Sequence, residues 1–148
     1  MNSRMPMRRR GFSLVELLVV VVILGTLLAV ASTRIGRQVS QDRTLRAATV
    51  VQGMLVEASQ LAVRRRSPVR VALSGNALRI SDRASGSVLR QRDFTADADL
   101  RTTLTLSPSA GITIFPSGRA DAALTVTLTG AQATRTVTRS ATGIVRRS

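Results

Sequence analysis

The chain lacks five residue types that support much of enzyme chemistry. Its 148 residues include no cysteine, histidine, lysine, tryptophan or tyrosine. These absences remove the thiol nucleophile, the imidazole base, the Schiff-base amine and the usual nitrogen and sulfur ligands of zinc. They also exclude a disulfide framework. Because no Ser or Asp constellation indicates catalysis either, the sequence predicts a structural or interaction protein, with no enzymatic activity and no cofactor.

Acidic residues are also scarce, and the charge balance is strongly basic. The chain has 22 arginines against 8 acidic residues, a net charge of +14. Without the four arginines at positions 4, 8, 9 and 10, the balance is 18 to 8, or +10. A charge of this size attracts anions such as phosphate polymers, anionic lipid headgroups or acidic partner subunits. A bias in the nucleotide composition of the gene explains the choice of arginine over lysine, but it does not explain the excess of basic over acidic residues.

One long apolar run is present, and it contains a single charged residue. Residues 12–31 form twenty positions that are apolar or small except for Glu16. As a helix they span about 30 Å, which is the thickness of the hydrocarbon core of a bilayer. A carboxylate in that environment costs several kcal/mol unless it is paired, so Glu16 is a functional candidate. The arginines before the run predict a cytoplasmic N-terminus and an exported remainder.

The order Arg8-Arg9-Arg10, Gly11, Phe12 and then Glu16 resembles the N-terminus of type IV prepilins and pseudopilins. The resemblance implies that a prepilin peptidase cuts after Gly11 and that the new N-terminal Phe12 is N-methylated. It also implies that Glu16 pairs with the terminal amine of a neighbouring subunit during filament assembly. The chain would then be a single-pass protein of the bacterial inner membrane, with its C-terminal domain in the periplasm or otherwise outside the cytoplasm.

Three alternative interpretations of the N-terminus compete. The small residues Ala29-Val30-Ala31 fit a conventional signal-peptidase site, which would release a secreted basic domain after Ala31. Arg9-Arg10 fits part of a twin-arginine export signal. The third alternative is an uncleaved single-pass anchor. The two export signals leave Glu16 in the hydrophobic region without a role, whereas the prepilin interpretation gives it one.

The helical pattern continues beyond the apolar run. From residue 35 to 62, apolar residues recur in steps of three and four and predict one buried helix face. This face consists of Val39, Leu45, Ala48, Val51, Leu55, Ala58 and Ala62, with Ala47, Met54 and Leu61 beside it. No proline lies between Phe12 and Ser67, so the sequence predicts one helix of about 50 residues that ends before Pro68.

After Pro68 the apolar residues alternate, which predicts six or seven β-strands, including a hairpin over residues 69–81. We therefore expect a pilin-like α+β fold, in which one long N-terminal helix packs on an antiparallel β-sheet domain. The predicted segments are a prepilin leader (1–11), a transmembrane and assembly helix (12–32), an amphipathic continuation of that helix (33–67) and a β-rich globular domain (68–148).

The C-terminal half narrows the resemblance. The segment Ile114-Phe115-Pro116-Ser117-Gly118-Arg119-Ala120, a following pair of alternating strands and a basic tail that begins at Gly143 are similar to GspH/FimT-type minor pseudopilins. The resemblance implies a minor subunit of a type II secretion pseudopilus or a type IV pilus, which serves protein secretion or pilus biogenesis. Its implied partners are other pilin or pseudopilin subunits, the prepilin peptidase and the inner membrane.

DNA capture is an alternative function within this group. Some members bind DNA through a C-terminal Gly-Arg-x-Arg motif, and the matching residues here are Gly143-Ile144-Val145-Arg146, with isoleucine at the first arginine. Arginines near the C-terminus could neutralise phosphates without reading bases. The candidate DNA-binding residues are Arg135, Arg139, Arg146 and Arg147.

An acidic segment raises the question of a metal. Asp93, Asp97 and Asp99 offer oxygen ligands of the kind that calcium prefers, and major pseudopilins bind calcium in such a loop. The segment lacks the glycine spacing of a recognised calcium loop, and Arg90, Arg92 and Arg101 lie close in sequence. The sequence therefore predicts ion pairs here and no metal site.

Overall fold

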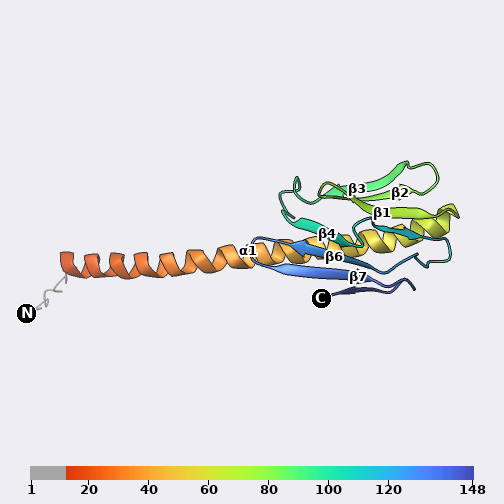
Figure 1. The fold of residues 1–148 in the computed structure, drawn as a ribbon. Helices are drawn as coiled ribbons and strands as arrows, with labels where there is room; N and C mark the ends of the chain where they lie inside the picture. The colour runs from red at the N-terminus through yellow and green to blue at the C-terminus, as the bar shows by residue number, and fades with distance from the viewer. Residues whose placement is uncertain (1–12) are drawn as a thin grey trace, which may run out of the picture. The chain divides into compact units, whose positions relative to one another are not determined.

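The computed structural model describes residues 13–148, except for the side chains of residues 31–38. This part of the chain forms a helix and then β-strands only (Figure 1): α1 (Leu14–Arg65), β1 (Val69–Ser74), β2 (Ala77–Asp82), β3 (Val88–Asp93), β4 (Thr103–Ser107), β5 (Ile112–Ile114), β6 (Leu124–Thr129), β7 (Thr134–Arg139) and β8 (Val145–Arg147). The contacts divide the chain into two units, one ending at Gly36 and the other running from Arg37 to Ser148. The predicted α+β class is confirmed.

Helix α1 ends where the sequence predicts, and its C-terminal cap shows why. The backbone N–H of Ser67 donates to the carbonyl of Ala62 at 3.3 Å, and that of Arg66 donates to the carbonyl of Val63 at 3.2 Å. Arg66 has a φ of 51°, the left-handed conformation that closes a helix in the Schellman motif. Pro68 then prevents the helix from continuing.

The strands form two antiparallel sheets, each with four strands. The first has the order β3-β2-β1-β5 and the second the order β4-β6-β7-β8. The predicted hairpin is confirmed, because Val71 of β1 pairs with Ile80 of β2. The predicted antiparallel β-sheet domain is confirmed, but the sequence did not show that its strands divide into two sheets. Strand β5 returns to pair with β1 through Val69 and Ile114, whereas β4 pairs with β6, so the strands separate into two groups.

The core of the second unit lies between the end of α1 and the inner faces of both sheets. The buried helix residues include the predicted Val51, Leu55 and Ala58. The largest apolar side chains from the strands and loops are Phe94, Leu78, Ile80, Ile112, Ile114, Leu124 and Leu128. This cluster confirms that the amphipathic half of the helix is covered by strands.

The predicted helix face is wrong at its N-terminal end. Val39 and Leu45 are 43% and 41% exposed, while Thr44 is fully buried. The hydroxyl of Thr44 donates to the carbonyl of Ser40 at 3.1 Å, so the polar group is satisfied inside the helix. Gly130, in the turn between β6 and β7, packs against Thr44 so closely that a Cβ there would collide with its Oγ1. The missing side chain of Gly130 therefore makes room for a buried threonine.

Candidate functional site

The predicted assembly residue Glu16 lies in the first turn of α1. The backbone N–H of Glu16 donates to Oγ of Ser13 at 3.3 Å, and that of Leu17 donates to the carbonyl of Ser13 at 3.2 Å. Ser13 is therefore the N-cap, and a serine followed by glutamate three positions later is the capping-box sequence. A carboxylate in the first turn also interacts favourably with the helix dipole, by about 0.3–1 kcal/mol. The N-cap thus fixes the backbone of Glu16 in the first helical turn.

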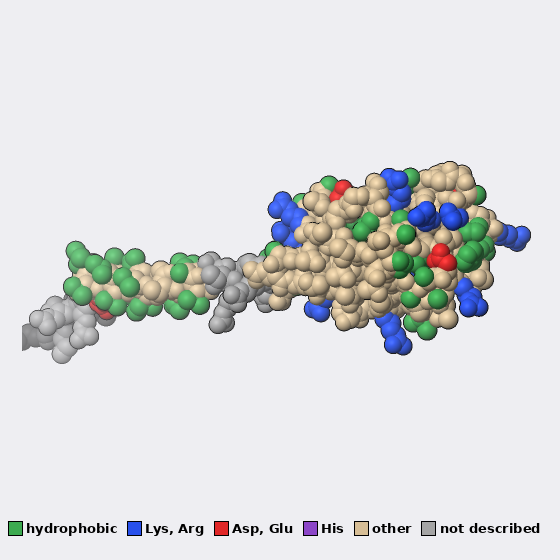
Figure 2. All heavy atoms as spheres, viewed as in Figure 1, with side chains coloured by type: hydrophobic (Ala, Val, Ile, Leu, Met, Phe, Trp, Pro, Cys, Tyr) green, Lys and Arg blue, Asp and Glu red, His purple; other side chains and the backbone are tan. Residues whose placement is uncertain are grey.

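The surface around Glu16 is apolar. From Leu14 to Val30, Glu16 is the only ionisable residue, and the leucine, valine and isoleucine side chains are exposed, up to 82% for Leu14. Figure 2 shows hydrophobic side chains along this first unit. An exposed apolar surface of this extent marks a site that contacts a membrane or other proteins.

Several predictions fall outside the described part of the chain. The leader (1–11) and the processing residues Gly11 and Phe12 lie there, and so does the first residue of the predicted transmembrane segment (12–32). Among the residues that the structure describes, no helix has the length and hydropathy needed to cross a bilayer.

The candidate DNA-binding residue Arg139 lies in the core and is not on the surface. Its side chain is fully buried. Its Nη2 donates to the carbonyl of Gly118 at 2.8 Å and to Oγ of Ser59 at 3.2 Å, and Nη1 donates to the carbonyl of Ser140 at 3.3 Å. Burial lowers the pKa of this guanidinium. An arginine without exposed surface cannot contact a phosphate, so the prediction for Arg139 is wrong, and the residue instead ties α1 to the sheet.

The other three candidate arginines do not form one cluster. Arg147 pairs across the sheet with the buried Val137 and donates from Nη1 to Oγ1 of Thr49 on α1 at 2.8 Å. Arg146 pairs with Thr138 and therefore lies on the opposite face of the same sheet, because successive strand residues alternate. Arg135 is exposed near the beginning of β7, on the same face as Val137. Arg146 and Arg147, which are adjacent in sequence, thus lie on different surfaces of the domain.

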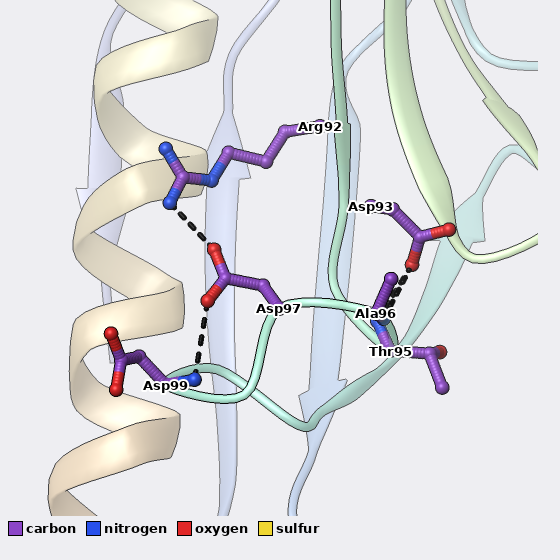
Figure 3. A network of polar contacts seen from close by, with 6 residues as sticks. All are labelled: Arg92, Asp93, Thr95, Ala96, Asp97 and Asp99. Carbon is purple, nitrogen blue, oxygen red and sulfur yellow. Dashed lines mark hydrogen bonds and ion pairs between the residues drawn. The ribbon is translucent and has the colours of Figure 1, made fainter.

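The acidic segment forms one ion pair and several hydrogen bonds that cap turns, as Figure 3 shows. A carboxylate oxygen of Asp97 accepts a hydrogen bond from Nη2 of Arg92 at 2.6 Å, and its other oxygen accepts from the backbone N–H of Asp99 at 3.1 Å. Asp93 caps the turn after β3 by accepting from the backbone N–H groups of Thr95 and Ala96. Arg92 lowers the pKa of Asp97, and the two backbone donors lower that of Asp93. Among the described residues, no group of three acidic side chains is arranged to hold a metal ion.

The residue that holds this acidic loop in place, Asn76, was not predicted from the sequence. Asn76 lies in the turn between β1 and β2, and its Nδ2 donates to Oγ1 of Thr95 at 2.6 Å and to the carbonyl of Thr102 at 2.7 Å. Its Oδ1 accepts from the backbone N–H of Leu104 at 2.7 Å. The turn sequence Ser-Gly-Asn predicts a bend, but these partners are distant in sequence, so no local signal identifies them.

Two known families match the chain, one at its N-terminus and the other over the end of α1 and the β-rich domain. Residues 6–32 match the prokaryotic N-terminal methylation motif, and residues 47–143 match the family described as type II transport protein GspH. A motif of the first kind implies processing by a prepilin peptidase and anchoring in the inner membrane before assembly. No functionally curated protein matches the chain.

Solved structures show the same fold. The type IV minor pilin FimU of Pseudomonas aeruginosa is 23% identical, with a TM-score of 0.60 over 73% of this chain and 90% of FimU. Its second crystal form gives a TM-score of 0.56 at 24% identity, over 70% of this chain and 91% of FimU. The minor pseudopilin EpsH from the type 2 secretion system of Vibrio cholerae is 14% identical, with a TM-score of 0.57 over 72% of this chain and 97% of EpsH. Because the GspH match spans well over half of its residues, the chain belongs to the GspH family of minor pseudopilins, which are structural proteins and not enzymes.

Proposed function

We propose that the chain assembles into its filament through the first part of α1, with Glu16 as the carboxylate that sets the register between subunits. The observation that carries this proposal is one carboxylate, in the first turn of α1, on an otherwise apolar helix surface. Such a surface is stable only when lipid or neighbouring helices cover it. A single acid within it demands a cationic partner.

The terminal amine of a neighbouring subunit can be that partner. Cleavage after Gly11 would leave Phe12 as the N-terminus, four residues before Glu16, and N-methylation keeps the amine basic. The match to the N-terminal methylation motif over residues 6–32 supports this processing. A signal peptidase cut after Ala31 would instead remove Glu16 together with the exposed apolar helix surface.

The filament is proposed to be a type II secretion pseudopilus. The family match supports this choice, and EpsH comes from such a system. FimU, a type IV minor pilin, shares the fold to a similar degree, so pilus biogenesis is the alternative. Before assembly the N-terminus would lie in the cytoplasm and the β-rich domain in the periplasm, as the arginine-rich leader indicates. DNA capture has less support, since Arg139 is buried and Arg146 and Arg147 lie on opposite faces.

Processing gives the first prediction. The mature chain isolated from membranes should begin at Phe12 and carry one added methyl group, because the peptidase cuts between the basic leader and the apolar helix. Intact-mass measurement distinguishes this product from one that begins at Ser32. A mass that corresponds to Ser32 would overturn the assembly proposal together with its processing step.

The assembly role of Glu16 gives the second prediction. Glu16→Ala should leave cleavage intact, because the change removes a charge from an apolar helix, but it should reduce incorporation beside the other pseudopilins at least tenfold. Co-purification of the full-length chain with those subunits measures this. Glu57→Ala is the matched control: Glu57 lies on the same helix but pairs with Arg90 at 2.8 Å, and its loss should leave incorporation unchanged. Equal incorporation of the Glu16 variant and wild type would remove Glu16 from the assembly mechanism.

A further inference from the structure

The second sheet has an outer face made of hydroxyl side chains. Leu104 of β4, Val126 of β6 and Val137 of β7 point inward and are buried, so the alternate positions of these strands point outward. Each alternate position in the three strands is a threonine or serine, and none is buried. These residues are Thr103, Thr105, Ser107, Thr125, Thr127, Thr129, Thr134, Thr136 and Thr138, and we call them the threonine face.

The strand register aligns these hydroxyls in rows. Thr127 pairs with Thr105 on one side and with Thr136 on the other. Beyond them, Ser148 exchanges two backbone hydrogen bonds with Thr136, at 2.9 and 3.0 Å. Neighbouring strands lie about 4.8 Å apart, and directly opposed side chains are in contact at that spacing. The rows therefore form a continuous surface of methyl and hydroxyl groups.

This face is almost free of charge in a strongly charged domain. From Arg37 to Ser148 the sequence has 17 arginines and 7 acidic residues, yet Arg146 is the one charged side chain that the register places on this side of the sheet. Figure 2 shows the region over β4, β6 and β7 almost entirely in tan, the colour of uncharged polar side chains and backbone. Like charges repel, so a second basic protein can approach this face more easily than the rest of the domain. Its lack of aromatic residues leaves no platform on which bases could stack.

A depression lies at one corner of the face, where β7 turns into β8. It has a volume of about 360 Å³ and is lined by residues that include Ala123, Thr142, Ile144 and Arg146. Ile144, which follows the turn after β7, is 57% exposed. The two ion pairs formed by the described residues involve other arginines, so Arg146 has no carboxylate partner among them. An apolar wall next to an unpaired guanidinium fits an apolar side chain that is flanked by a carboxylate.

We propose that the threonine face docks a neighbouring, different subunit of the filament, which inserts an apolar side chain into the depression and pairs a carboxylate with Arg146. Buried apolar anchors surrounded by near-neutral contacts are the usual arrangement of interface hot spots. A second copy of this chain fits less well, because its own threonine face brings a further arginine and no acid. The proposal rests on the function proposed above and adds a second contact, made by the β-rich domain.

Cysteine cross-linking tests the proposal, because the chain has no cysteine of its own. The full-length chain is co-expressed with the other pseudopilins of its system, as Thr136→Cys or as the control Gln91→Cys on exposed strand β3, and is treated with a bifunctional maleimide. We expect Thr136→Cys to cross-link to a different pseudopilin and Gln91→Cys to give at least tenfold less product. Equal yields from both positions, or a cross-link between two copies of this chain, would overturn the proposal.

Charge substitutions separate this proposal from the assembly function. Thr136→Arg and Arg146→Glu should each lower the cross-linking yield of a cysteine at Thr127 at least tenfold, while Gln91→Arg leaves it unchanged. Circular dichroism melting confirms that each variant folds. If Glu16→Ala prevents incorporation but Thr136→Arg does not change the cross-link, the docking face is wrong and the assembly function stands. If Glu16→Ala incorporates normally while Thr136→Arg removes the cross-link, the assembly function is wrong and the docking face stands.

Discussion

At the scale of single residues, Asp82 shows how a carboxylate joins distant parts of the chain. It ends β2 and is largely buried. Its Oδ1 accepts hydrogen bonds from the backbone N–H groups of Ala84 and Ser85, and its Oδ2 accepts from the hydroxyl of Ser67 beyond the end of α1 at 2.9 Å. The Ser85 backbone donor and then the Ser67 hydroxyl lower the pKa of Asp82 from 3.8 to about 2.

This pKa gives a prediction about acid stability. A carboxylate whose pKa is lower in the folded state stabilises the fold above its unfolded pKa of 3.8, and this contribution is lost as the pH falls through about 2. Asp82→Asn should therefore lower the melting temperature at neutral pH, and the difference from wild type should shrink between those two pH values. Ser67→Ala, which removes one donor, should show a smaller effect of the same form. A difference that stays constant down to pH 2 would contradict this account.

Residue identity alone did not predict what Arg139 does. Arg135, Val137 and Arg139 alternate along β7, which predicts a shared face, and the buried Val137 shows that this face points inward. The sequence does not show that Ser59 and Gly118 supply hydrogen-bond acceptors at the same depth. Buried charges are tolerated only where such acceptors exist, so the location of Arg139 depended on contacts 80 and 21 residues away in sequence.

At the scale of elements, features set by local sequence could be predicted, whereas features set by long-range contacts could not. The helix and the first hairpin were predicted correctly, because spacing, Pro68 and the turn residues act within a few positions. The division into two sheets was not predicted. Strand β1 pairs with β5, which lies over 40 positions later in the sequence, and the periodicity of apolar residues does not indicate which strands pair. The processing and assembly residues Gly11, Phe12 and Glu16 come from a local motif and could be proposed from sequence. The threonine face, by contrast, could be identified only from the register of three strands.

The contact between α1 and the turn after β6 gives a prediction at this scale. Gly130→Ala should lower the free energy of unfolding by about 1–3 kcal/mol, because the new Cβ meets Oγ1 of Thr44 in a packed contact. Gly53→Ala is the matched control. Gly53 lies on α1, the helix that carries Thr44, and no atom lies within 4 Å of its Cβ position. Alanine there should therefore raise the free energy of unfolding by up to about 1 kcal/mol. Denaturant unfolding of a fragment that begins at Ile35 measures both. Effects of the same sign would show that the contact with Thr44 is not tight.

At the scale of the whole molecule, the arginine excess is dispersed. The domain carries most of its positive charge on separate surfaces, including the end of α1 at Arg64-Arg65-Arg66 and the two sides of β8. Dispersed charge attracts polyanions over long distances but makes few simultaneous phosphate contacts.

This dispersion predicts weak binding to DNA. The fragment that begins at Ile35 should bind duplex DNA without sequence preference at low salt and lose most of that binding near physiological ionic strength. The salt slope should change by about 0.9 for each phosphate contact removed. Replacing Arg146 and Arg147 by alanine should change that slope no more than replacing Arg43 and Arg46. Tight binding at physiological salt that depends on Arg146 would make DNA capture the leading function instead.

The edge strands of the two sheets affect how readily copies of this domain aggregate when they are crowded in a filament. An open strand edge is a template on which another chain can add its own strand, and such addition leads to β-aggregation. Here β5 and β8 are only three residues long, β3 carries Arg90 and Arg92, and Pro108 directly follows β4. Three of the four margins are therefore short or charged, and Pro108 opposes an extension of the fourth, β4, beyond Ser107. These margins disfavour the addition of a strand by a neighbouring subunit, so copies crowded side by side have few places at which β-aggregation can begin.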